Sequence, residues 1–214
     1  MTRRIVVISA GLREPSSTSL LGERLAEATL TALAARGSIA EVEVVELRHH
    51  GGDIMQAMTS FAPEALRAVF DRVAAADGVI ALTPLFNTSY SGLFKSFFDV
   101  LPEGSLAGKP VLLGATGGTP RHSLALDYAL RPMFAYLHAD VLTTGVFAAT
   151  EDWGAAGDDV RPLTERIARA GESLAEAIAA RPAVVVADEF ASTASFEEMF
   201  SRLRSADDDF ENGL

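Results

Sequence analysis

The sequence predicts a doubly wound α/β domain, in which a five-stranded parallel sheet is covered by helices on both faces. Short apolar stretches typical of strands alternate with longer stretches of helical periodicity through residues 4–180. This alternation is typical of parallel strands joined by crossover helices. The stretches 78–82 and 110–114 are uniformly apolar, as expected for strands buried on both faces. With 214 residues, 49% of them hydrophobic, the chain is long enough to bury a core of this kind.

The first half of the domain is predicted to contain three strands and two helices. Arg4–Ile8 is a short apolar run and forms the first strand, and Ser19–Arg36 is a helix because its apolar residues recur on one side. Glu41–Leu47 alternates between polar and apolar residues, as a strand does. Pro63–Ala76 is the second helix, with its proline in the first turn, where a missing N–H costs little. Gly78–Leu82 is the third strand.

The second half continues the same alternation. Ser91–Leu101 is an amphipathic helix, and Pro110–Gly114 is the fourth strand. Ser123–Leu137 is the fourth helix, and an internal Arg-Pro step predicts a kink there, because proline lacks an N–H and its ring crowds the preceding turn. Val141–Phe147 is the fifth strand, and Pro162–Ala180 is the last helix of the core.

The composition changes after Arg181, which predicts a domain of residues 1–181 and a C-terminal extension of residues 182–214. Ala183–Val186 is either a short extra strand or a packed extended arm. Ser195–Glu198 is a capping box that opens a short amphipathic helix. Because so short a helix is marginally stable alone, its apolar stripe is expected to dock either on this domain or on another chain. The residues of this stripe are Phe196, Met199, Phe200 and Leu203.

The charge and the cysteine content exclude several classes of protein. A net charge of −11 argues against a nucleic-acid partner and against anionic membrane surfaces. No apolar run approaches the roughly 18 residues that span a bilayer. The absence of cysteine excludes disulfides, cysteine-ligated zinc, iron–sulfur clusters and thiol chemistry. The first apolar run breaks at Ser9, which indicates a strand rather than a signal peptide, so the cytoplasm is the expected compartment.

No metal site and no catalytic side chain is predicted. His49 and His50 are the one metal-like cluster, but adjacent residues do not share a helical face, so a solvated loop is favoured. The sequence has no nucleophile elbow, and its ligand-type loops hold no paired carboxylates beyond Glu14. Chemistry carried by a bound cofactor fits this pattern better than acid–base or nucleophilic catalysis.

The loop after the first strand contains four consecutive hydroxyl residues that run into a helix. Unpaired N–H groups and the helix dipole favour a phosphate there, and an arginine adds charge. The loop is neither a Walker A sequence nor Gly-x-Gly-x-x-Gly, which disfavours ATP, GTP and dinucleotide-binding folds. An ordinary N-cap among solvated serines is the alternative. The predicted phosphate-binding residues are Arg13, Ser16, Ser17, Thr18 and Ser19.

The loop after the third strand combines flat apolar side chains with hydrogen-bonding ones, which suits a planar heteroaromatic ring with a polar rim, such as a flavin. A proline-initiated turn with a polar cap is the alternative. Lys95 and Asp99, in the helix that follows, lie one helical turn apart and are consistent with a surface ion pair. The predicted ring-binding residues are Pro84, Leu85, Phe86, Asn87, Thr88 and Ser89.

The loop after the fourth strand, Gly114–His122, contains paired glycines that let the backbone approach a ligand ring, although Gly-Gly also marks ordinary turns. The loops after strands 1, 3 and 4 lie side by side if the strand order is 2-1-3-4-5, around the switch point where open α/β sheets bind ligands. The candidate residues in this third loop are Thr116, Gly117, Gly118 and Arg121, with His122 as a further candidate.

These loops resemble those of the NAD(P)H-dependent FMN reductases. Residues 83–99 resemble the Pro-x-Tyr-Asn-x-Ser…Gly…Lys…Asp signature, with Phe86 in the place of the tyrosine, and residues 114–132 resemble the corresponding block of the sulfonate-utilisation flavin reductases. The first loop resembles the Arg…Ser-x-Ser phosphate loop, although Ser9–Leu12 departs from the commoner Gly-Ser-Pro. The resemblance covers roughly residues 3–150 and implies a flavodoxin-like fold with strand order 2-1-3-4-5.

The resemblance implies an enzyme that transfers a hydride from NADPH or NADH to FMN. It implies that the first loop holds the flavin phosphate, that the second and third loops line the ring, and that Arg121 contacts the nicotinamide nucleotide. Members commonly supply reduced FMN to a separate flavin-dependent monooxygenase, and the long extension is similar to that of an actinobacterial-type branch. The alternatives are an FMN-bound quinone, azo-dye or chromate reductase, a flavodoxin-type electron carrier and a structural interaction protein. The choice between NADPH and NADH stays open, as does whether FMN stays bound or leaves as product.

Surplus apolar surface predicts self-association, as a homodimer or a homotetramer. The fourth helix and the extension carry more large apolar side chains than one sheet face can cover, and exposed apolar patches usually mark contacts. The alternative is that the extension folds back over the patch. The residues concerned in the fourth helix are Tyr128, Met133, Phe134, Tyr136 and Leu137.

Overall fold

The structure is a computed structural model that describes residues 2–154 and 162–184. Its seven-stranded sheet has the order β2-β1-β3-β5-β6, with β4 paired to β3 and β7 paired to β5. All pairings are parallel except β3 with β4. The strands are β1 (Arg3–Ser9), β2 (Ala40–Glu46), β3 (Gly78–Phe86), β4 (Ser89–Tyr90), β5 (Pro110–Gly117), β6 (Asp140–Val141) and β7 (Val146–Ala149).

The doubly wound α/β class is confirmed, and the strand order differs from the prediction in two details. The short strand β4 adds an antiparallel hairpin to the end of β3. The predicted fifth strand, Val141–Phe147, is divided into β6 and β7. The reason lies in the fourth helix, from which the Arg131 guanidinium donates to the carbonyl groups of Leu142 (2.9 Å) and Thr143 (3.2 Å). These carbonyls are therefore engaged by a side chain where a continuous strand would use them in the ladder.

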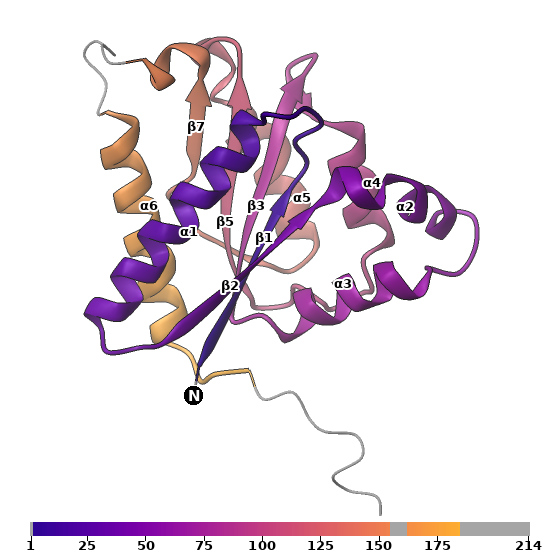
Figure 1. Cartoon of the computed structure of the whole chain (residues 1–214), viewed down its shortest axis with the longest axis horizontal. Coiled ribbons are helices and arrows are strands. Elements are labelled where there is room, and N and C mark those ends of the chain that lie inside the picture. The colour runs from indigo at the N-terminus through magenta and orange to yellow at the C-terminus, as the bar shows by residue number, and fades with distance from the viewer. Residues whose placement is uncertain (1, 155–161, 185–214) are drawn as a thin grey trace, which may run out of the picture. The chain divides into compact units, whose positions relative to one another are not determined.

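Helices cover both faces of the sheet. Helices α1 (Ser17–Ala35) and α6 (Leu163–Ala179) lie together on one face, while α3 (Glu64–Ala75), α4 (Gly92–Val100) and α5 (Arg131–Tyr136) lie on the other (Figure 1). Each face has its own cluster of buried apolar side chains, with the alternate residues of the central strands contributing to one cluster or the other. These two clusters hold the strands in register and fix the edge where the ligand-type loops begin.

Residues 47–57 correct the prediction of a solvated loop around His49 and His50. Both histidines lie in a 3₁₀ turn, η1 (Leu47–His50), which leads directly into α2 (Gly51–Ala57). The segment folds against the core because Leu47 and Ile54 are completely buried. A stretch of eleven residues with Leu47, Ile54 and Met55 as its only large apolar side chains does not reveal a helix by periodicity alone.

The fourth helix is not the continuous α-helix predicted over Ser123–Leu137. A 3₁₀ turn, η2 (Pro120–His122), precedes a π-helical segment, η3 (Leu126–Leu130), which runs into α5. At the junction the Arg131 N–H donates to the carbonyl of Leu126, five residues earlier. Because Pro132 lacks an N–H and its ring needs room against the preceding turn, a widened turn is the local solution. The predicted irregularity therefore lies just before the proline, as a π-helix.

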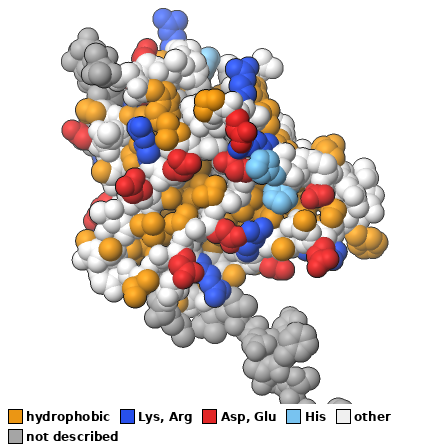
Figure 2. All heavy atoms as spheres, viewed as in Figure 1, with side chains coloured by type: hydrophobic (Ala, Val, Ile, Leu, Met, Phe, Trp, Pro, Cys, Tyr) orange, Lys and Arg blue, Asp and Glu red, His pale blue; other side chains and the backbone are white. Residues whose placement is uncertain are grey.

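The C-terminal segment was predicted to contain an extra strand or arm and a short helix. Ala183 and Val184 are described and are not part of a strand, whereas the predicted amphipathic helix after Ser195 lies outside the described residues. In the part of the chain that the structure describes, no helix is both long enough and apolar enough to cross a bilayer. Acidic and basic side chains are interspersed with hydrophobic ones on the face seen in Figure 2.

Candidate functional site

The candidate site lies at the carboxyl edge of the sheet, where β1, β3 and β5 end next to one another (Figure 1). Ser9 at the end of β1 is in register with Leu82, and Pro84 is in register with Thr116 across β3 and β5. The N–H of Ala10 donates to the carbonyl of Leu82 at 2.9 Å, which continues the β1–β3 pairing into the first loop. The structure thus brings the three predicted loops together, as the order of these strands requires.

The first loop is wrapped tightly around the start of α1. Ser16 is the N-cap, and its Oγ accepts a hydrogen bond from the N–H of Ser19 at 3.2 Å. The Ser19 hydroxyl lies 3.0 Å from that of Ser9, and the N–H of Gly11 donates to Ser9 Oγ at 3.3 Å. A β-carbon on Gly11 would lie 2.1 Å from Ser16 Oγ, so any larger residue would displace the capping side chain. The loop leaves the exposed side chains of Arg13 and Ser17 facing outward.

Thr18 and Thr116 contact each other in the interior. Their hydroxyl oxygens are 2.8 Å apart, and the residues are only 2% and 5% exposed. Both were predicted as ligand-binding residues, one on the phosphate loop and one on the third loop. In the structure their hydroxyls link the first turn of α1 to the end of β5. This bond holds two of the loops at a fixed separation beneath the surface of the site.

The second loop is shorter than predicted, because β3 continues through Thr83–Phe86 and turns back into β4. Phe86 pairs with Ser89, and the tip of this hairpin is formed by Asn87 and Thr88, with φ angles of 48° and 68°. Left-handed backbone is costly for a β-branched residue such as threonine. The Thr83 hydroxyl fixes the base of the hairpin, accepting from the N–H of Ser91 (3.0 Å) and donating to the Pro84 carbonyl (2.9 Å). Strain at the tip is thus held in place by the base.

The third loop also begins later than predicted, since β5 continues to Gly117. A β-carbon on Gly117 would lie 2.9 Å from the Phe147 ring, whereas Gly118 has open space around it. Arg121 is exposed on η2, where its N–H donates to the Thr119 hydroxyl at 3.3 Å. A hollow of about 460 Å³ joins the second and third loops, and its lining residues are Thr88, Arg121, His122, Leu124, Ala125, Tyr128 and Ala129.

The arrangement supplies neutral donors, one exposed arginine on each side and backbone that approaches the site closely. Lys95 and Asp99 form the predicted ion pair on the exposed side of α4. One residue of the site was missed by the sequence argument. Arg48, on η1, hydrogen-bonds to the first loop across 35 positions of sequence. No local pattern gives that contact, because it depends on β2 lying beside β1.

Known proteins resemble this chain over the residues that form the three loops. The family described as NADPH-dependent FMN reductase matches residues 3–154, which is more than half of the chain. The chain is 35% identical over 175 residues to an FMN reductase (NADPH) of Pseudomonas aeruginosa, a match that covers 80% of this chain and 90% of the relative. It is 37% identical over 148 residues to the NADH-dependent FMN reductase SfnF of Pseudomonas putida, covering 69% of this chain and 78% of the relative.

Two solved structures are similar over most of the chain. An oxidoreductase of Corynebacterium diphtheriae is 44% identical, with a TM-score of 0.81, and the match covers 85% of this chain and 99% of that one. The apo form of an NADH:FMN oxidoreductase (EMOB) is 28% identical, with a TM-score of 0.72, and the match covers 90% of this chain and 100% of that one.

Proposed function

Because the chain belongs to the NADPH-dependent FMN reductase family, we propose that it transfers a hydride from NADPH or NADH to FMN at the carboxyl edge of its sheet. The site is assigned from the meeting of three loops around the ends of β1, β3 and β5, one of which exposes the Ser17 hydroxyl at a helix start. When bound, FMN supplies the hydride-accepting chemistry, and the protein binds, orients and shields the reactants.

The first loop is proposed to hold the flavin phosphate. The start of a 19-residue helix carries unpaired N–H groups and a partial positive charge, which favour a phosphate. Ser17 and Arg13 are exposed there and add a hydroxyl donor and a cation. Ser16 and Ser19 are engaged in the cap and shape the loop, and Thr18 acts from the interior through Thr116. This donor set fits a phosphate monoester.

The hairpin tip and the third loop are proposed to line the flavin ring. The exposed Asn87 and Thr88 offer backbone and side-chain hydrogen-bonding groups, while Pro84 and Phe86 offer apolar surface. Leu85 and Ser89 belong to the hairpin that positions them. Gly118 leaves space for a ring to approach the backbone of the third loop. An aromatic ring with a polar rim suits this mixture of groups.

Arg121 is proposed to contact the nicotinamide nucleotide. Its side chain borders the hollow that joins the two ring-lining loops, next to His122 and Thr88. A guanidinium suits the phosphate groups of either nucleotide, so the choice between NADPH and NADH is an experimental one. The names of the relatives are divided between the two: one is named for NADPH and the other for NADH.

We also propose that the protein is a homodimer or a homotetramer in the cytoplasm and that it passes reduced FMN to a separate flavin-dependent monooxygenase. The support for self-association is the exposed aromatic surface beside the fourth helix, where Tyr128 and Tyr136 are 80% and 83% exposed. Light scattering at micromolar concentration tests the oligomeric state, and a monomer mass contradicts it. Transfer of reduced flavin is tested by coupling the purified protein to a purified monooxygenase.

The proposed reaction is tested with two measurements on the full chain. A visible spectrum of the purified protein shows whether FMN stays bound. Oxidation of NADPH and NADH is then followed with and without added FMN and riboflavin. We expect oxidation that depends on FMN. Oxidation that is unaffected by flavin, with no flavin in the spectrum, contradicts the proposal.

A further inference from the structure

Arg48 joins the end of β2 to the first loop. Its Nη1 donates to the Arg13 carbonyl at 2.9 Å, and its Nη2 donates to the Glu14 carboxylate at 2.5 Å. Its Nε lies 3.7 Å from the Glu46 carboxylate and 3.3 Å from Nε2 of His49. The side chain is only 18% exposed. A planar guanidinium with a rigid set of donors is suited to holding several acceptors at once.

The tip of the loop has little else to hold it. Across the described ranges 2–154 and 162–184, the hydrogen bonds from Arg48 are the ones that reach residues 12–15. The neighbouring bonds end at Gly11 on one side and begin again at Ser16 on the other. The backbone that carries Arg13 beside the start of α1 is therefore fixed by a side chain from η1, which follows β2.

Arg48 also balances a charge that is unfavourable at a phosphate site. Glu14 is the acidic residue of the first loop and is adjacent to Arg13, and its carboxylate is largely exposed. An unpaired carboxylate near a bound phosphate dianion repels it, and this repulsion is screened by salt. The ion pair with Arg48 neutralises the carboxylate and turns it toward β2.

We propose that Arg48 is a positioning residue for the phosphate loop, which holds the Arg13 backbone in place and neutralises Glu14, and thereby makes the site selective for phosphate-bearing flavins. This inference rests on the proposed function of the loop as the FMN phosphate site. It assigns Arg48 no contact with substrate. Its effect is on FMN and not on riboflavin, because riboflavin has the same ring but no phosphate.

The test compares flavin binding by the full-length wild type and three variants, using FMN and riboflavin as separate ligands in fluorescence titrations. We expect Arg48→Ala to weaken FMN binding about tenfold, because ordering roughly one residue of released backbone costs that much affinity. Riboflavin binding should stay within about twofold, a difference of a few tenths of a kcal/mol. Arg72→Ala is the matched control, because Arg72 makes a comparable ion pair with Glu43 on an exposed face of β2 and α3.

The third variant, Arg48→Ala combined with Glu14→Gln, separates the effect of the Glu14 charge from the effect of releasing the Arg13 backbone. It should recover about threefold of the lost FMN affinity at low salt, and the recovery should shrink as salt screens the Glu14 carboxylate. Equal losses of FMN and riboflavin in Arg48→Ala, or no loss of FMN, overturn the proposal. Absence of any recovery in the double variant overturns the neutralising role. If the wild type binds neither flavin, the proposed function itself fails, which is a different result.

Discussion

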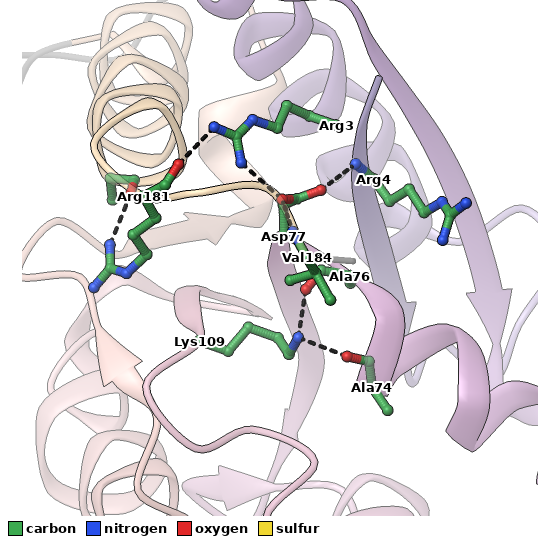
Figure 3. Close-up of polar contacts among 9 residues, drawn as sticks. Arg3, Arg4, Ala74, Ala76, Asp77, Lys109, Arg181 and Val184 are labelled. Atoms are coloured by element: carbon green, nitrogen blue, oxygen red, sulfur yellow. Dashed lines mark hydrogen bonds and ion pairs between the residues drawn. The ribbon is translucent and has the colours of Figure 1, made fainter. Parts of the chain in front are cut away.

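The two ends of the parallel sheet use polar residues in opposite ways. At the amino end, the Asp77 carboxylate is 4% exposed and accepts from Arg3 Nη1 (2.9 Å), the Arg4 N–H (2.8 Å) and the Val184 N–H (3.0 Å), as Figure 3 shows. The other terminal nitrogen of Arg3 donates to the Arg181 carbonyl at 2.6 Å. A buried charge is tolerated here because protein donors surround it.

Lys109 is a second buried charged residue at the amino end of the sheet. Its ammonium donates to the carbonyl groups of Ala74 (3.1 Å) and Ala76, at the C-terminus of α3 (Figure 3). The residue is only 8% exposed, and burial lowers the pKa of the Lys109 amine below its usual 10.5, while the nearby Asp77 opposes the shift. A cation at a helix C-terminus is favourable, and here it also occupies carbonyls that the helix leaves unpaired.

The carboxyl end, where we propose the ligand site, exposes several polar side chains. Ser17, Asn87 and Arg121 are exposed, and the hairpin tip carries left-handed backbone. Both ends of the sheet have internal hydrogen bonds, but the amino end buries its charged groups in them, whereas the carboxyl end also exposes polar groups. Substitutions at the amino end should therefore lower stability, and substitutions of exposed groups at the carboxyl end should change ligand binding.

The largest effect is expected from Asp77→Ala. Removing the carboxylate leaves Arg3 and two backbone N–H groups without their acceptor, which should cost about 3 kcal/mol of unfolding free energy. Urea denaturation measures it, with Asp99→Ala as the control, because Asp99 belongs to an exposed ion pair worth less than about 1 kcal/mol. FMN affinity of the folded protein should not change. Equal losses of stability for the two variants contradict the distinction between the two ends.

Ser17→Ala, at the carboxyl end of the sheet, should weaken FMN binding and leave stability unchanged. Loss of one exposed hydroxyl donor at the start of α1 should weaken FMN by about 1–2 kcal/mol, while riboflavin affinity and the urea midpoint stay the same. Titration with both flavins checks this. If both flavins are weakened equally, the phosphate does not lie at this helix start.

Thr88→Gly should separate the effect of backbone strain on stability from the effect of the side chain on ligand binding. Glycine adopts a φ of 68° without steric cost, so the substitution should raise stability by up to about 1 kcal/mol, less the entropy that glycine gains on unfolding. The same change removes a side chain from the hollow beside Arg121 and should weaken ligand binding. Denaturation and flavin titration on one sample measure both. A variant that is less stable and binds FMN unchanged contradicts the idea of stored strain.

The smallest effect concerns pH. Since the pKa of Lys109 is lower in the folded protein, the unfolded chain holds a proton that the folded chain has released between the folded pKa and 10.5. The free energy of unfolding therefore rises with pH between the folded pKa of Lys109 and 10.5. Below the folded pKa, the cost of burying the charged amine is fully present. Lys109→Met should lack this rise when urea midpoints are compared from neutral pH upward. An identical pH dependence in the variant contradicts the assignment.

Local patterns determined much of the fold. The first strand and the helices before β3 and after β7 were predicted within a residue or two, because apolar spacing and proline or serine at helix starts act over short distances. The three loops could also be located in the sequence, since a hydroxyl run, a proline–asparagine turn and paired glycines are local patterns. The resemblance to a known family then gave the function that the comparisons support.

Contacts between different elements could not be predicted from local patterns. The pairing of Thr18 with Thr116, the division of the fifth strand by Arg131 and the contact of Arg48 with the first loop all join segments on different elements. The extension of β3 into a hairpin likewise depends on Ser91 bonding back to Thr83. The sequence indicated most of the strands, helices and loops, because these depend largely on neighbouring residues, but it did not indicate α2, β4 or the division of the fifth strand. It did not determine which polar side chains face a ligand and which satisfy one another, because that depends on contacts created when the sheet assembles.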